Sequence, residues 1–435
     1  MEEEKGIQYL QKMTETYEAA ADINPMTLKT VSEVSEKKHS AIRKKLEQKK
    51  HSLQFLPAQM EEFSKSKNFE YKGQRLKSAY AIDIVHNLIL KYYFKKDNSF
   101  SLMSTILKEK YGHLYNYYID WLVDSGIIYM ARNYKAGQNA RIYKIADSVL
   151  KGQIKRYVNK DAILLKKYKN KVSQVEDGGL KDGLIDSDVK AMLVDDLFHA
   201  EIQFDRAIFY LDNVAHNDTD IYNRNRYSVE CVNDKHIFYH FDGYGRMHTN
   251  FTILKSFIRK NCLLLDGEET HEIDIKNSQP LFLNKIIEDS GTKWIAIEEL
   301  ELFKELTING TYYQHVMNHI GTKDKPMVKE MTYKVLFGKN MANSKADKVF
   351  KSLFPTIHNF IRLYKKDRGD YRILAYELQK AESNLIFNKI VKQIKEYSPD
   401  MKIVTVHDSI IVPRSRKDEA EAIFKTKLFE EFRLF

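Results

Sequence analysis

The sequence predicts an α+β fold with a mostly helical N-terminal half, and two observations lead to this prediction. From residue 236 onward, short apolar and β-branched runs typical of strands alternate with segments whose apolar residues recur at helical spacing. Between residues 75 and 150, three helical segments come first and two strand-like runs follow. Such a mixture of elements is expected for α+β domains.

Composition and charge limit the classes of protein to which the chain can belong. Its 435 residues are enough for two or three domains, and a formal net charge of +10 favours a polyanionic partner such as DNA. No stretch approaches the roughly 20 consecutive apolar residues of a membrane span, so no membrane partner is expected. Residues 1–5 are acidic and polar, unlike a secretory signal. Cys231 and Cys262 lack metal-site spacing, so we expect free thiols in the cytoplasm.

The first 150 residues divide into two segments that differ in composition and periodicity. Residues 1–70 are highly charged, which predicts a solvated helical or partly disordered arm. In residues 71–150, helices are predicted at 79–93, 100–111 and 115–124, and a β-hairpin with a polar tip follows.

Helices followed by a hairpin with a basic tip are typical of a winged-helix nucleic-acid-binding domain. The tip would allow Arg132, Lys135 and Arg141 to reach phosphates while a helix docks on the duplex. The alternative is a small helical domain whose hairpin only packs on its neighbour.

The region 151–235 is predicted to be mostly helical and polar. Eight lysines and arginines crowd residues 151–171, as a surface that tracks a nucleic-acid backbone would, or as a merely solvated face. Residues 236–435 carry the motifs described next.

Asp274 ends a short predicted strand, Thr270–Ile275, and a helix is predicted to follow from residue 279 or 280. A carboxylate at a strand end, beside the Ile275 carbonyl, is a good ligand pair for a hard metal ion. Alone, an aspartate at such a junction is more often a helix N-cap or a surface charge.

Asp408 lies at the tip of a second predicted β-hairpin, formed by residues 401–406 and 409–412, with His407 before it. A desolvated carboxylate between two buried strands needs a counter-charge, which a metal ion supplies. An ordinary polar turn is the alternative.

A helix predicted from Lys325 to Gly338 is the third element. Lys325, Lys329, Tyr333 and Phe337 are spaced by four and therefore lie on one face. Two cations and two aromatic rings along one stripe suit a nucleoside triphosphate, with the cations on the phosphates and the rings against base and sugar. A core stripe with a solvated basic end is the alternative. Gly338 is predicted to end the helix as a C′ glycine.

Three further positions, in two segments, carry little meaning alone. Arg246 follows Gly245, an arrangement that suits close approach to a nucleic-acid backbone or minor groove. Gln379 and Glu382 lie near the start of a long helix predicted from Leu374 to Glu396.

Taken in order, residues 236–415 resemble the family A polymerase superfamily, which includes DNA polymerase I-like enzymes and the single-subunit RNA polymerases of phages and mitochondria. The helix motif of that superfamily is a basic residue, three residues, Lys, then seven residues to Tyr-Gly. Lys325, Lys329 and Phe337-Gly338 keep this spacing. Asp274 and Asp408 match its two metal-binding aspartates.

Other residues extend the resemblance. Gly245-Arg246 is similar to a Gly-Arg motif before the first aspartate, and Arg259 falls near a second arginine of the family. Gln379 resembles a glutamine that touches the template, and His407 precedes the second aspartate as it does in both branches.

The resemblance implies a right-hand fold with palm and fingers in residues 236–435 and a helical, thumb-like region or linker in 151–235. The fingers would be minimal, since only 408 − 329 = 79 residues separate Lys329 from Asp408. It further implies two Mg²⁺ ions, with Mn²⁺ as a substitute, held by Asp274, Asp408 and the Ile275 carbonyl.

The implied reaction is attack of a primer 3′-hydroxyl on the α-phosphate of a nucleoside triphosphate, with a DNA template and primer as partners. The residues expected to bind the nucleotide are Lys325, Lys329, Tyr333, Phe337 and Gln279, and Lys329 is also expected to be catalytic. The residues expected to bind the primer and template are Arg246, Arg259, Gln379 and His407.

Departures from the family pattern leave the sugar open. The DNA polymerases follow the first aspartate with Tyr-Ser-Gln-Ile-Glu, whose Glu helps to exclude ribose, and this chain has no such Glu. Ser278 and Ser409 are closer to the RNA polymerase pattern. Tyr333 is a DNA polymerase trait, and Phe337 lacks the hydroxyl that RNA polymerases use to recognise ribose. We expect a DNA polymerase, with a single-subunit RNA polymerase or primase as the alternative.

The remaining alternatives belong to other classes. One is a catalytically inactive DNA-binding replication initiator, and another is a metal-dependent nuclease, in which the Lys325, Lys329 and Tyr333 stripe has no role. No proofreading exonuclease pattern precedes residue 236. By analogy of fold alone, a compact polymerase would suit DNA replication in a phage, plasmid or other mobile element. The sequence indicates no protein partner.

Overall fold

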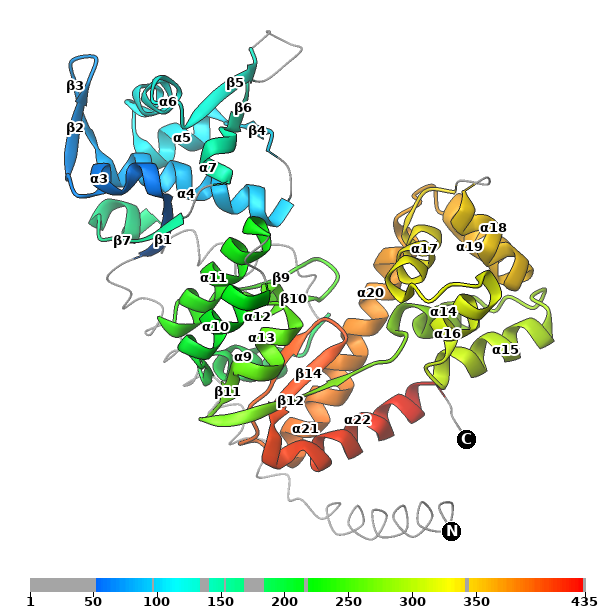
Figure 1. The fold of residues 1–435 in the computed structure, drawn as a ribbon. Helices are drawn as coiled ribbons and strands as arrows, with labels where there is room; N and C mark the ends of the chain where they lie inside the picture. The colour runs from blue at the N-terminus through cyan, green and yellow to red at the C-terminus, as the bar shows by residue number, and fades with distance from the viewer. Residues whose placement is uncertain are drawn as a thin grey trace.

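Two hydrophobic cores organise the computed structural model of the protein (Figure 1). The structure describes residues 52–95, 98–133, 141–151, 154–167, 184–214, 218–340 and 344–432. The first core is built from buried residues between Leu56 and Leu164, and the second from those between Ile185 and Phe424. Helices and small antiparallel sheets occur in both parts, so the fold is of the α+β class. Within the described ranges, no helix has the length and apolar character needed to cross a membrane.

The N-terminal unit, residues 52–167, is closed by two strands from its two ends. Strand β1 (Ser52–Pro57) pairs antiparallel with β7 (Ile154–Asn159). Leu56 and Ile154 bring side chains from both strands into the first core, where they are buried. The boundary expected at residue 150 is therefore wrong, because β7 belongs to this unit. Residues 52–70 belong to it as well, and residues 1–51 of the expected arm lie outside the described part of the chain.

A helical bundle with a small sheet forms the rest of this unit. The sheet has the strand order β4-β6-β5. Its elements are α4 (Ser78–Lys95), β4 (Phe100–Ser101), α5 (Ser104–Tyr111), α6 (Tyr115–Asp124), β5 (Ile128–Arg132), β6 (Ile142–Ile145) and α7 (Asp147–Leu150). The helix expected to begin at Phe100 begins only at Ser104, because Phe100 pairs with Tyr143 at the edge of the sheet.

A second layer lies over this bundle. It consists of η1 (Ala58–Met60), α3 (Glu61–Ser64) and a hairpin of β2 (Asn68–Tyr71) and β3 (Gln74–Lys77). Phe63 and Phe69 of this layer pack on Trp121 of α6, with ring centroids 4.4 and 4.8 Å away. The apolar face of α6 is thus covered from two sides.

The second unit is built on a five-stranded antiparallel sheet with the order β13-β14-β12-β11-β8. Its strands are β8 (Ala200–Ile202), β11 (Leu263–Leu265), β12 (Glu268–Asp274), β13 (Val404–Val406) and β14 (Ser409–Pro413). Residues 151–235, expected to be mostly helical, thus contribute two strands, β7 and β8, to two different sheets. A short hairpin of β9 (Tyr239–Phe241) and β10 (Met247–Thr249) lies beside this sheet.

Helices enclose the sheet. The earlier ones are α9 (Ser187–Leu197), α10 (Phe204–Val214), α11 (Thr219–Asn233), α12 (Asn250–Ile253) and α13 (Ser256–Cys262). The later ones are α20 (Ile373–Ser383), a π-helical stretch η2 (Asn384–Val391), α21 (Lys392–Tyr397) and, after the turn η3 (Arg414–Arg416), α22 (Lys417–Phe432). The first three of these later helices run without a break from residue 373 to 397, which confirms the long helix predicted there.

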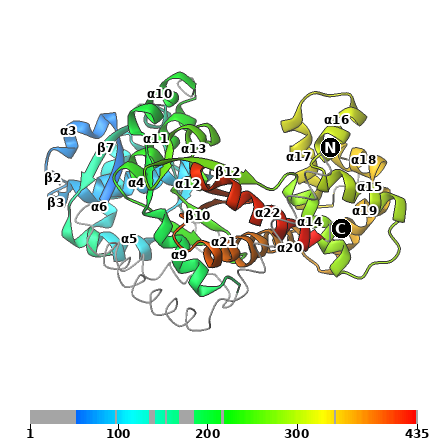
Figure 2. The ribbon, with the colours of Figure 1, turned by 90° about the horizontal axis from the view of Figure 1, so that it is seen from below.

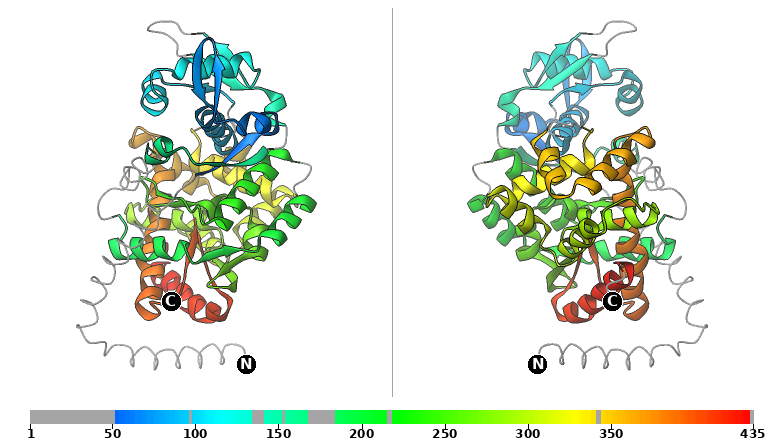
Figure 3. Two further views of the ribbon diagram at one scale, coloured as in Figure 1. Left: turned by 90° about the vertical axis from the view of Figure 1, so that its left-hand side faces the viewer. Right: turned by 90° about the vertical axis from the view of Figure 1, so that its right-hand side faces the viewer.

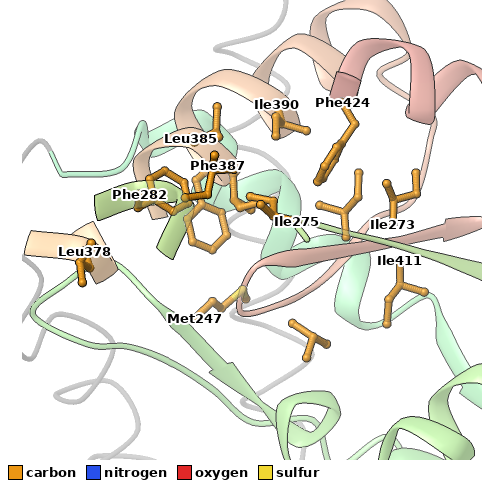
Figure 4. Close-up of a cluster of buried hydrophobic side chains, with 14 of the residues drawn as sticks. Met247, Ile273, Ile275, Phe282, Leu378, Leu385, Phe387, Ile390, Ile411 and Phe424 are labelled. Atoms are coloured by element: carbon orange, nitrogen blue, oxygen red, sulfur yellow. The ribbon is translucent and has the colours of Figure 1, made fainter. Parts of the chain in front are cut away.

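The second core covers both faces of the sheet, and these later helices pack on one of them. Figure 4 shows Ile273 of the sheet on the side of Ile390 of η2 and Phe424 of α22, and Ile411 on the opposite side. All four side chains are buried, with Ile390 and Ile411 at most 1% exposed. Burial of branched side chains from elements far apart in the chain holds η2 against the sheet.

An all-helical lobe stands beside the sheet and carries the predicted basic helix (Figure 2). Its helices are α14 (Ser278–Asp289), α15 (Ile297–Ile308), α16 (Tyr312–Ile320), α17 (Lys325–Phe337), α18 (Lys345–Leu353) and α19 (Pro355–Asp367). Phe303, Tyr312 and Phe354 form its centre and are at most 1% exposed. The chain enters the lobe from β12 and returns to the sheet along α20.

Helices α4 and α11 join the two units (Figure 3). The Asn223 side chain donates to the Tyr93 hydroxyl at 2.8 Å, and the Tyr92 hydroxyl donates to Asp220 at 2.8 Å. Arg156 of β7 forms an ion pair with Asp234, just beyond α11.

Candidate functional site

The two aspartates singled out in the sequence lie at one end of the central sheet. In the register of β12 with β14, Asp274 is opposite Ser409, the residue after Asp408. The Ile275 backbone N–H donates to the Asp408 carbonyl at 3.1 Å, which extends the ladder one step beyond the strand. The sheet therefore brings together two residues that are 408 − 274 = 134 positions apart.

The turn between β13 and β14 holds an unusual backbone conformation. His407 has φ +53°, in the left-handed region that residues other than glycine seldom adopt. Such a conformation costs on the order of 1–2 kcal/mol and is often found at functional sites. The tight turn presents His407 and Asp408 at the end of the sheet, as the sequence predicted for this hairpin.

Glu382 is the residue of this site that the sequence did not single out by itself. It is buried near the end of α20, 1% exposed. Its Oε1 accepts from Arg246 at 2.6 Å, and its Oε2 accepts from the Ser278 hydroxyl at 2.6 Å and from the Gln279 amide. These three donors, from two other segments, engage both oxygens of the carboxylate.

Neighbouring carboxylates act on Asp408. Burial, and next the negative charge of Glu382, raise the pKa of Asp408 to about 6, and Asp274 acts in the same direction. The positive charge of Lys329 opposes the rise. Within the described residues, neither Asp274 nor Asp408 forms a salt bridge, although the charges of Arg246 and Arg259 act on His407 and that of Lys329 acts on Asp408.

Helix α17 faces the aspartates with its basic and aromatic stripe. Asp324 caps its first turn by accepting from the Met327 N–H at 2.9 Å, and Pro326 occupies that turn. Lys325 and Lys329 are exposed, and the Lys329 ammonium lies 5.5 Å from the centre of the Tyr333 ring.

Two further contacts connect this stripe to the sheet. Tyr333 stacks on Phe337 with ring centroids 5.1 Å apart and an interplanar angle of 27°. Tyr313 of α16 interacts with both Tyr333 and Asp408, and burial raises its pKa. Tyr313 therefore links the aromatic part of the stripe to Asp408.

The C-terminal end of α17 differs from the prediction. Gly338 is extended, with φ −78° and ψ 171°, so it is not a left-handed C′ glycine. A Cβ there would lie 2.4 Å from the Lys334 carbonyl oxygen, so the close approach of backbone explains the glycine. The buried Lys365 of α19 supplies the cap, donating to the carbonyls of Val335 at 2.6 Å and Gly338 at 2.8 Å. Burial lowers the pKa of Lys365 to about 8.

The residues predicted to hold nucleic acid have different environments. Arg246 holds Glu382, and Arg259 holds Glu272 at 3.1 Å and the Leu254 carbonyl, so each arginine first positions a neighbouring group. Gln379 is partly exposed on α20.

The His407 ring is partly open to solvent, but it sits among cations. Desolvation and the charges of Arg246, His248 and Arg259 lower the pKa of His407 to about 4. The ring is therefore neutral at pH 7, and it meets the His248 ring edge to face at 6.3 Å.

The basic hairpin of the N-terminal unit stands apart from this site (Figure 1). Arg132, at the end of β5, and Arg141, just before β6, are exposed. Lys135 lies outside the described residues. Helix α6, which precedes the hairpin, carries exposed Asp120 and Asp124, and Phe63 and Phe69 cover part of it; both features disfavour docking of this helix on a duplex.

No model of a known protein family matches the chain, and no curated protein does. In the part of the chain that the structure describes, no group of three or more His, Cys, Asp and Glu side chains is arranged to hold a metal ion. A metal at this site would therefore depend on Asp274, Asp408 and oxygen ligands from the backbone or a substrate.

Proposed function

We propose that this chain is a template-directed nucleic-acid polymerase that transfers nucleotides at the β12–β14 end of the sheet. The observation that supports this proposal is the meeting of Asp274 and Asp408 opposite the cationic and aromatic stripe of α17. Two carboxylates alone would serve a nuclease equally well. A helix that presents Lys329 and the Tyr333–Phe337 stack toward the same carboxylates suits a nucleoside triphosphate, for which a nuclease has no use.

The side chains of the stripe have distinct roles in this proposal. Lys325 and Lys329 neutralise the triphosphate, since their exposed ammonium groups are accessible to phosphate oxygens. Tyr333 and Phe337 present a stacked surface to the base and sugar. Lys365 keeps the end of α17, and with it Phe337, in place.

The donor set at the sheet suits Mg²⁺. Both carboxylates offer hard oxygen atoms, and the raised pKa of Asp408 shows that a nearby cation would relieve electrostatic strain. Mg²⁺ in nucleotide-transferring enzymes is commonly held by one or two carboxylates together with substrate phosphates, so a three-residue cluster is not required. When bound between Asp274, Asp408 and the Ile275 carbonyl, two Mg²⁺ ions, or Mn²⁺ in their place, would activate the primer hydroxyl and neutralise the leaving pyrophosphate.

The primer and template would approach from the side of α20 and the β9–β10 hairpin. Arg246 and Gln379 lie there, and His407, neutral at pH 7, adds no charge that would compete with Lys329. Arg246 and Arg259 act mainly as positioning residues, because each holds a carboxylate of the site. The proposed architecture is a right hand, with the central sheet as palm, the α14–α19 lobe as small fingers and the preceding helices as thumb.

The N-terminal unit would bind DNA in this proposal as a winged helix. Its order of helix, strand, two helices and hairpin is that of a winged helix. Because α6 is acidic and partly covered, the contacts would come from the hairpin residues Arg132 and Arg141, with Lys135 between them in the sequence.

Ribonucleotide use, as by an RNA polymerase or primase, is the second function that a specific observation favours. Gln279 is 4% exposed, and its amide donates to Glu382, while its Oε1 atom has no hydrogen-bond partner in the described part of the chain. A buried acceptor of this kind could receive a hydrogen bond from a sugar hydroxyl. Ser278, beside it, is held by the same carboxylate.

The test is extension of a labelled primer on a DNA template with Mg²⁺, using deoxynucleotides and ribonucleotides in parallel. Extension should be lost in Asp408→Ala and Asp274→Ala and retained in Asp418→Asn, an exposed aspartate of α22. Duplex binding should survive in all three variants. Extension that persists in Asp408→Ala would contradict the proposal, as would failure of the wild-type protein on both primed and unprimed templates.

A further inference from the structure

A group of tyrosines and cations outside the aspartate site forms a second distinctive surface. Tyr244, in the β9–β10 turn, stacks on Tyr376 of α20 with centroids 4.3 Å apart and an interplanar angle of 12°. The Arg372 guanidinium lies 5.8 Å from the Tyr376 ring and 6.0 Å from the Tyr371 ring. The Lys339 ammonium lies 5.6 Å from the centre of the Tyr371 ring. We call Tyr244, Tyr371, Arg372 and Tyr376 the tyrosine platform.

One part of the platform is open to solvent, and its surroundings carry more cations than anions. Tyr371 is 38% exposed, Arg372 and Lys339 are exposed as well, and Tyr244 and Tyr376 are partly exposed. Residues 362–372, which lead into α20, carry five basic and two acidic side chains, and of the five only Lys365 is buried. Tyrosines placed only for packing would turn their faces into a core, whereas Tyr371 lies outside both hydrophobic cores.

The orientation of the platform is defined by local contacts. Asp370 accepts from Arg372 through both carboxylate oxygens, at 3.1 Å from Nε and 3.0 Å from Nη2, which fixes the guanidinium plane. The Tyr244 backbone N–H donates to Asp242 at 2.9 Å and holds the turn that presents its ring. A pre-ordered set of rings and one planar cation can stack bases with little loss of side-chain entropy.

We propose that the tyrosine platform binds single-stranded nucleic acid by base stacking and leads it to the aspartate site. Sequence-tolerant single-strand binding combines aromatic faces with cations that follow the backbone, and the platform has both. Exposed aromatic side chains also bind protein partners, but the excess of cations around residues 362–372 favours a polyanion.

The geometry of α20 gives the strand a path. Tyr376 and Glu382 are six residues apart on one helix, about 9 Å along its axis. Gln379 lies between them, and Arg246, which holds Glu382, follows Tyr244 by two residues. A base stacked on Tyr376 would therefore be followed by nucleotides at Gln379 and then at the aspartates. The identification of this strand as a template rests on the proposed function, whereas binding itself does not.

The test is affinity for a labelled single-stranded oligothymidylate, measured by fluorescence anisotropy without Mg²⁺ or nucleotides. Tyr371→Ala and Tyr376→Ala should each weaken binding about tenfold, and Tyr371→Phe and Tyr376→Phe should bind like the wild type. Affinity for a blunt duplex should not change in any of the four. Tyr397→Ala, at an exposed tyrosine of α21, is the matched control and should bind normally.

Single-strand affinities of both alanine variants within about twofold of the wild type would overturn the proposal, given unchanged circular dichroism. An equal loss for blunt duplex, or in Tyr397→Ala, would overturn it too. The two proposals can fail independently. A protein that binds single strands through the platform but never extends a primer would support the binding proposal and contradict the polymerase proposal.

Discussion

Replacing Asp408 with asparagine is expected to stabilise the metal-free protein at neutral pH while abolishing nucleotide transfer. Asp408 has a pKa of about 6 in the fold against an ordinary value of 3.8, because burial and Glu382 disfavour its charged form. Above pH 6 the ionised carboxylate therefore reduces the free energy of unfolding, and below about pH 4 it is protonated in both states and has no such effect. Asparagine keeps the shape and removes the charge.

The magnitude follows from the shift. A difference of about 2 pKa units corresponds to roughly 3 kcal/mol, and partial exposure of Asp408 reduces this to about 1–2 kcal/mol. For a cooperative unit of this size, the thermal midpoint should rise by about 2–6 °C.

The assay is thermal unfolding in EDTA across a pH series, with Asp418→Asn as the control for loss of an exposed carboxylate. The advantage of Asp408→Asn should be full near pH 7 and should shrink as the pH falls through 6 toward about 4. Added Mg²⁺ should stabilise the wild type and not the variant. A variant that is no more stable than the wild type at neutral pH, or whose advantage does not depend on pH, would refute the reasoning.

Three other predictions concern the surroundings of the site. Glu382→Gln should lower the pKa of Asp408, so the acidic limb of the pH–rate profile for extension should move to lower pH. If this limb did not move, the effect of the Glu382 charge on Asp408 would be contradicted. Gly338→Ala should destabilise the protein by about 1–3 kcal/mol in denaturant titrations, because its Cβ meets the Lys334 carbonyl at 2.4 Å, and a neutral effect would show that the backbone can relax. Lys365→Met leaves two carbonyls without their donor and should destabilise the protein by about 1–3 kcal/mol. The pKa of Lys365 is lowered to about 8, so the wild type should gain stability as pH rises from 8 toward 10.5. The difference in free energy of unfolding between the wild type and Lys365→Met should therefore widen over this range. A constant difference would argue against a buried ammonium.

Periodic patterns in the sequence were enough to predict the local elements. The spacing of Lys325, Lys329 and Tyr333 predicted a helix, and α17 spans Lys325–Phe337. The apolar runs on both sides of His407 and Asp408 predicted a hairpin, and β13 and β14 form it. Periodicity depends only on the spacing of residues within one segment, so it can be read from a single sequence without knowledge of the tertiary structure.

Local signals were misleading where a distant partner decided the conformation. Phe100 has helical neighbours, but pairing with Tyr143 makes it part of a strand. Gly338 follows a helix as a C′ glycine would, but Lys365, 27 residues away, caps the helix, and the glycine is extended.

The sequence by itself determined which residue types stand at the ends of the strands and along the basic helix, and it therefore indicated a chemistry. Only the tertiary structure decided which of them meet. Glu382 contacts Arg246 across 136 residues and Ser278 across 104, and β1 pairs with β7 across 97 to 107 positions. Such contacts arise because burial of a common core selects one packing of the elements, and no local pattern encodes that choice.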